Sequence, residues 1–128
     1  MECIINPEKD ANIYWENDPL SIETELKVEG ITIDQYCLKN NIEQIDILKI
    51  DVQGNELKVL EGAKRMLTNN RIKLIFLEIS IASNYEGQSE IDQVIRLLKI
   101  HKYRIFNFFK MKHQEGRLIE CDALFYLD

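Results

Sequence analysis

The stretch DILKIDVQGNELKVLEGAKRML, residues 46–67, decides the fold of this chain. It lies in an apolar run over residues 45–52 that does not simply alternate with polar residues, which predicts a strand buried on both faces, as in a parallel sheet. Gly54 then allows a sharp turn, and apolar residues recur at helical spacing from Leu57 to Leu67. A buried strand, a tight turn and a helix are therefore expected in succession.

The same strand and helix unit is expected a second time. A second buried strand is predicted over residues 73–79, and Ser89 with Asp92 three residues later predicts the start of its helix. Thr32 and Gln35 form the same pattern ahead of a short helix over residues 33–39. These units predict an α/β fold with parallel strands.

The last third of the chain predicts a different arrangement. Residues 103–109 and 118–127 are typical of strands, and Gly116 between them favours a turn. The sheet is therefore expected to finish with an antiparallel hairpin.

Composition sets the class of protein. With 128 residues, 45% hydrophobic and 30% charged, the chain is expected to be one globular domain, with an irregular or hairpin lead-in over residues 1–30 and an α/β core over residues 31–128. A net charge of −6 argues against nucleic acid as a partner. The chain has no apolar run long enough for a membrane span and no signal-peptide pattern, so a cytoplasmic protein is expected. The three cysteines are widely spaced, which argues against disulfides and a zinc site.

Two carboxylates lie where predicted strands end and the following loops begin. Asp51 closes the first buried strand, and Glu78 lies near the end of the second. Ligands of open α/β sheets bind at this edge, so either residue could orient or deprotonate a substrate hydroxyl. Alternatively, Asp51 and Glu56 only favour the positive end of the following helix. Lys49 is either a buried partner of these carboxylates or a surface side chain at the sheet edge. The sequence predicts no metal ligands.

The chain resembles the FkbM family of S-adenosylmethionine-dependent methyltransferases. The resemblance rests on a few short motifs. They are Ile33-Asp34, LKIDVQGNE at residues 48–56, LEGA at residues 60–63, LE at residues 77–78, and the closing CDALFYL at residues 121–127.

The resemblance implies the C-terminal part of a Rossmann-like class I methyltransferase fold. It also implies that S-adenosylmethionine is the cofactor and that the substrate is a small molecule whose hydroxyl, on a sugar or polyketide-like acceptor, is methylated. Asp51 and Glu78 are then the candidate catalytic residues. Lys49, Gln53, Gly54 and Glu56 are the candidate substrate-binding residues, with Gln53 standing where the family usually has Glu.

The family's glycine-rich cofactor turn has no counterpart in the sequence, so a C-terminal fragment of such an enzyme is expected. Its first strand would then be an exposed sheet edge. The expected partner is a complementing N-terminal half or a second copy of the chain. The alternative is a non-catalytic remnant or interaction module that pairs with another chain through this edge.

Overall fold

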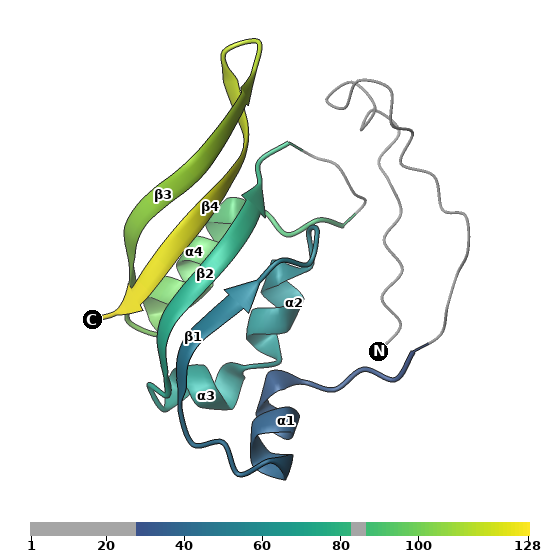
Figure 1. Cartoon of the computed structure of the whole chain (residues 1–128), viewed down its shortest axis with the longest axis vertical. Coiled ribbons are helices and arrows are strands. Elements are labelled where there is room, and N and C mark those ends of the chain that lie inside the picture. The colour runs from purple at the N-terminus through teal and green to yellow at the C-terminus, as the bar shows by residue number, and fades with distance from the viewer. Residues whose placement is uncertain (1–27, 83–86) are drawn as a thin grey trace.

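The computed structural model describes residues 28–82 and 87–128 (Figure 1). The predicted lead-in over residues 1–30 falls almost wholly outside these ranges, as do Asn84, Tyr85 and Glu86. In chain order the elements are α1 (Ile33–Lys39), β1 (Ile45–Ile50), α2 (Glu56–Glu61), α3 (Lys64–Thr68), β2 (Ile72–Ser80), α4 (Ile91–Ile100), β3 (Tyr103–Gln114) and β4 (Arg117–Leu127). No helix within these ranges is long and apolar enough to cross a membrane.

The four strands form one mixed sheet in the order β1-β2-β4-β3. β1 and β2 are parallel, whereas β4 is antiparallel to both β2 and β3. The expected α/β fold, with parallel strands followed by an antiparallel hairpin, is thus confirmed. The turn of the hairpin is at Gly116, whose φ of +76° is readily adopted only by a residue without a side chain.

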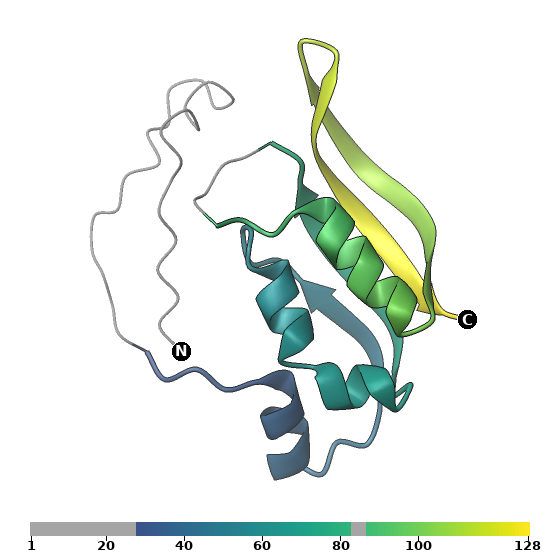
Figure 2. The same cartoon turned by 180° about the vertical axis from the view of Figure 1, so that it is seen from behind.

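Helices α2, α3 and α4 lie on the same face of the sheet, as the two opposite views show (Figures 1 and 2). The core lies between them and the sheet. Its largest fully buried side chains include Leu60, Leu67, Ile75, Leu77, Leu98, Tyr103 and Phe125. The opposite face carries no helix within the described residues, and we call it the open face.

The prediction that the first strand is buried on both faces is wrong. Ile47 in β1 is 63% exposed, and Lys49 is also exposed, because both point to the open face. Leu48 and Ile50 point to the helices and supply the buried half of the strand. Among the described residues β1 pairs only with β2, so the expected exposed edge is present.

The predicted helix over residues 57–67 is broken at Gly62 and Ala63 into α2 and α3. The reason is Asp34 of α1, whose two carboxylate oxygens accept the backbone N–H groups of Arg65 (2.7 Å) and Met66 (3.1 Å) at the start of α3. The backbone N–H of Asp34 in turn donates to the Gly62 carbonyl at 2.9 Å. These contacts satisfy polar groups that the break leaves without helical partners.

Candidate functional site

Asp51 and Glu78 lie side by side at the carboxyl ends of the two parallel strands. The register pairs Ile50 of β1 with Leu77 of β2, which places the next residues, Asp51 and Glu78, at the same level. Both side chains face the open side of the sheet and share a hydrogen bond. The ammonium of Lys49 pairs with Asp51 Oδ2 at 2.9 Å. The structure therefore brings together three of the residues that the sequence singles out.

The two carboxyl groups differ in proton affinity. The hydrogen bond from Lys49 lowers the pKa of Asp51, with further hydrogen bonds to Glu78 and Gln53 acting in the same direction. Burial raises the pKa of Glu78 to about 7, and its hydrogen bond to Asp51 and the charges of Asp51, Glu120 and Asp122 add to the effect. Neighbouring carboxyls whose environments push their pKa values apart are typical of acid and base pairs in enzymes.

The turn between β1 and α2 is held by its own residues. Gln53 and Gly54 both have positive φ, +49° and +96°. The backbone N–H of Gly54 donates to Glu56 Oε1 at 2.9 Å, and Glu56 is only 5% exposed. Gly54 and Glu56 are therefore engaged with each other, which agrees with the structural interpretation of Glu56 at the helix start.

The loop between β2 and α4 is hydrogen-bonded to the same turn. The hydroxyl of Ser89 donates to the Gly54 carbonyl at 2.8 Å and accepts the backbone N–H of Leu57 at 3.1 Å. The prediction that Ser89 caps α4 is wrong, because Glu90 is the cap and forms the reciprocal pair with Gln93. Ser89 is used instead to fix the position of the turn beside Asp51.

One residue of the site was missed by sequence reasoning. Asp122 on β4 lies directly opposite Glu78 in the β2–β4 register and is 8% exposed. The ammonium of Lys110 on β3 is 3.5 Å from Asp122 Oδ2. The one signal that could have indicated it is an acidic residue inside the otherwise apolar closing stretch CDALFYL.

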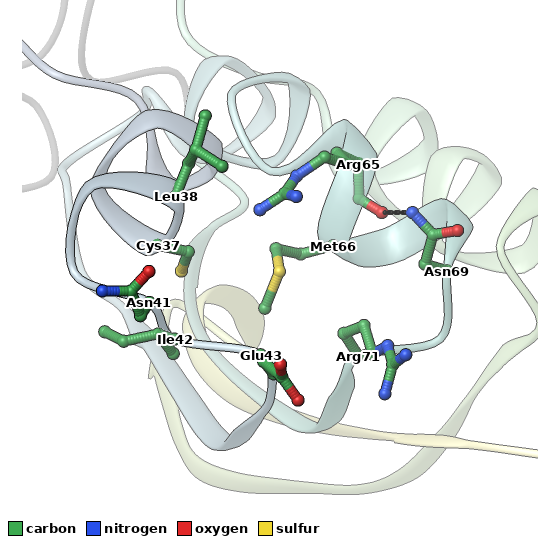
Figure 3. A pocket seen from close by; sticks show the side chains of 9 residues that line it. All are labelled: Cys37, Leu38, Asn41, Ile42, Glu43, Arg65, Met66, Asn69 and Arg71. Carbon is green, nitrogen blue, oxygen red and sulfur yellow. Dashed lines mark hydrogen bonds between the residues drawn. The ribbon is translucent and has the colours of Figure 1, made fainter.

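A hollow of about 380 Å³ lies at the other end of the parallel strands (Figure 3). The residues that line it come from α1, α3 and the segments just before β1 and β2. They are Cys37, Leu38, Asn41, Ile42, Glu43, Arg65, Met66, Asn69 and Arg71. Because Asp51 and Glu78 lie at the opposite ends of the same strands, this hollow is separate from the carboxyl pair.

The sequence was also compared with known proteins. The model of the family described as Methyltransferase FkbM domain matches residues 2–105. The chain is similar to 2-O-methyltransferase NoeI of Sinorhizobium fredii (strain NBRC 101917 / NGR234), with 36% identity over 106 residues. No solved structure is significantly similar. The region matched to NoeI is 83% of this chain but only 37% of NoeI, so the chain spans little more than a third of that relative.

Proposed function

Because this chain belongs to the FkbM methyltransferase family, we propose that it serves in the transfer of a methyl group to a hydroxyl of a small acceptor, a sugar or a polyketide-like molecule. The observation that carries the proposal is the Asp51–Glu78 pair at the carboxyl ends of the parallel strands, where ligands of α/β sheets bind. The name of the similar NoeI protein, a 2-O-methyltransferase, supports an oxygen as the methyl acceptor.

Glu78 is the general base in this proposal. Its pKa of about 7 lies near the operating pH, where a base combines a useful ionised fraction with sufficient proton affinity. Glu78 would take the proton of the acceptor hydroxyl when the oxygen is methylated, and the sulfonium methyl donor would leave as a neutral thioether. Asp51, held ionised by Lys49, accepts a hydrogen bond and orients the acceptor. Gln53, which hydrogen-bonds Asp51, fixes the position of that carboxylate.

S-adenosylmethionine would supply the methyl group as a sulfonium. The turn at Gly54 does not fit this cofactor, because the backbone N–H of Gly54 already donates to Glu56 and an atom added at Gly54 Cα would lie 2.9 Å from Gln88 Cγ. The turn therefore has no free cradle for the cofactor. We propose that the cofactor is held outside the described residues, by a complementing N-terminal half, a second copy or a longer chain of Rossmann-like methyltransferase fold. The cytoplasmic location expected from the sequence stays a prediction.

A second candidate function is a non-catalytic module that pairs with another chain through β1. It is favoured by the exposed edge of β1. It is also favoured by apolar groups on the open face, such as Ile47 and the rings of Phe76 and Phe109, whose centroids are 6.4 Å apart. Unpaired strand edges add strands from partner chains readily.

Calorimetric titration with S-adenosylmethionine and S-adenosylhomocysteine distinguishes the two functions. Saturable heat from the folded chain, followed by transfer of labelled methyl to a panel of sugar and polyketide alcohols, supports the first. The rate constant kcat/KM should then rise with pH and level off above about pH 7, as Glu78 ionises. Glu78→Gln should abolish this rise. A folded chain that binds neither compound, alone or as an oligomer, would show that this chain is not a methyltransferase by itself and that a cofactor site must come from another segment.

A further inference from the structure

Four carboxyl groups and three lysines share one region of the open face. Each of three carboxylates has its own lysine, whereas no lysine or arginine among the described residues pairs with Glu78. The pairs are Lys49–Asp51 at 2.9 Å, Lys110–Asp122 at 3.5 Å and Lys112–Glu120 at 2.9 Å. Glu78 is thus the one carboxyl of the four without an ion pair of its own, which favours its protonated form; Lys49 acts on it only at longer range.

Asp122 is placed next to Glu78 by the sheet itself. The two residues are direct partners in the antiparallel β2–β4 register, where opposite side chains share a face about 5 Å apart. Glu120 is opposite Ser80, two residue pairs further along on the same face, and its charge also acts on Glu78. Glu78 therefore has Asp51 on one side and two carboxylates of β4 on the other.

The charge of Asp122 is poorly compensated. Its Oδ2 atom is buried and accepts no hydrogen bond within the described part of the chain. Lys110 approaches this atom only at 3.5 Å, and its side chain is 84% exposed, so water screens its effect. Lys110 lies in an irregular part of β3, between the paired residues Phe109 and Lys112, and has a φ of +45°. Bulges of this kind redirect side chains and are frequent next to active sites.

The fold gives no reason for a carboxylate at position 122. Aspartate is disfavoured in strands, and a buried carboxylate oxygen without a hydrogen bond costs stability. An apolar residue would stabilise this position of β4 better. The proximity of Asp122 to Glu78 supplies the missing reason.

We propose that Asp122 is a positioning residue that acts through Glu78: its charge, opposite Glu78 in the sheet, strengthens Glu78 as a base. The inference rests on the proposed function for its meaning in catalysis. Its physical content, the effect of one carboxyl on the other, can be measured without any methyl transfer.

The test is a ¹³C NMR titration of the side-chain carboxyls of the whole chain, with the Glu78 signal assigned by its loss in Glu78→Gln. In Asp122→Asn, which keeps the shape of the side chain, the midpoint of Glu78 should fall by about half a pH unit or more. In Lys110→Met, which exposes the charge of Asp122, it should rise. Lys73→Met is the control, because Lys73 is also an exposed lysine of this sheet paired with an aspartate, Asp46, at 2.6 Å. It should leave the midpoint unchanged.

An unchanged midpoint in both Asp122→Asn and Lys110→Met would overturn the proposal. Lys110→Met changes an exposed side chain and keeps the test valid even if Asp122→Asn does not fold. If the midpoint moves as expected but no methyl transfer is found with any acceptor, then the proposed function fails and the coupling of Asp122 to Glu78 stands. In an active preparation, Asp122→Asn should also shift the rising limb of the pH profile to lower pH.

Discussion

Glu78 makes the stability of the folded chain depend on pH. Its pKa is about 7 in the folded chain and 4.5 in the ordinary, solvated state. Between these values the unfolded chain has lost a proton that the folded chain keeps, so the free energy of unfolding falls as pH rises from 4.5 to 7. Above pH 7 the ionised Glu78 lowers the free energy of unfolding by its full amount. Below pH 4.5 this loss of stability is absent.

The size of the penalty follows from the shift. At about 1.4 kcal/mol per pKa unit, the change from 4.5 to about 7 corresponds to about 3 kcal/mol before solvent screening. Glu78 is only partly buried, so water screens it and we expect about 1–2 kcal/mol. Glu78→Gln cannot ionise, and its amide can still donate a hydrogen bond to Asp51. The variant should therefore be more stable than the original chain by about this amount at pH 8 and equally stable at pH 4.5.

Urea unfolding at pH 4.5, 6 and 8 measures these differences. The pKa of Asp51 is lowered, so Asp51 stays largely ionised over this range and does not obscure the result. Glu61→Gln, an exposed helical residue without an ion pair among the described residues, is the control and should show no such pH dependence. If Glu78→Gln is equally stable or less stable than the original chain at pH 8, then the electrostatic account of this site is wrong.

Three further substitutions test the framework of the site by urea unfolding. Gly54→Ala should cost about 1–3 kcal/mol, because φ is +96° and the new methyl group must displace Gln88; a loss below 0.5 kcal/mol, taken as a rough lower bound, would contradict this. Asp34→Ala should cost about 1–2 kcal/mol by removing the cap of α3, and Asp34→Asn should recover part of it, whereas equal losses would show that the cap is not responsible. Tyr103→Phe should cost about 1 kcal/mol, because it removes the 2.6 Å hydrogen bond to the Ile72 carbonyl; no loss would mean that water replaces this bond.

The parts of the fold that could be predicted depend on local signals. Thr32 and Gln35 form the reciprocal cap of α1 that their spacing predicts, and Gly116 makes the predicted turn. The break between α2 and α3 could not be predicted, because it depends on Asp34, which is about thirty residues away in sequence. The exposure of Ile47 escaped prediction for a similar reason: an apolar run does not show how many faces of its strand are covered.

Only part of the candidate site could be predicted from the sequence. Asp51 and Glu78 stand out because each lies at or near the end of an apolar parallel strand. Asp122 does not, because it lies within an antiparallel strand and reaches Glu78 only through the β2–β4 register. Glu56 has the right residue type, but its carboxylate is turned to the backbone of Gly54.

Asp51 lies at the end of an edge strand, so the two sides of the site have different surroundings. On one side the strands β2 and β4 supply Glu78, the proposed base, and Asp122, which we propose acts through it. On the other side, beyond β1, the described residues supply no wall. Under the proposed function, the surface that selects the acceptor is contributed largely by whatever packs against that edge. In the proposed mechanism, acceptor selectivity and proton transfer are therefore encoded in separate segments, so one acceptor can be exchanged for another while Asp51, Glu78 and Asp122 stay unchanged.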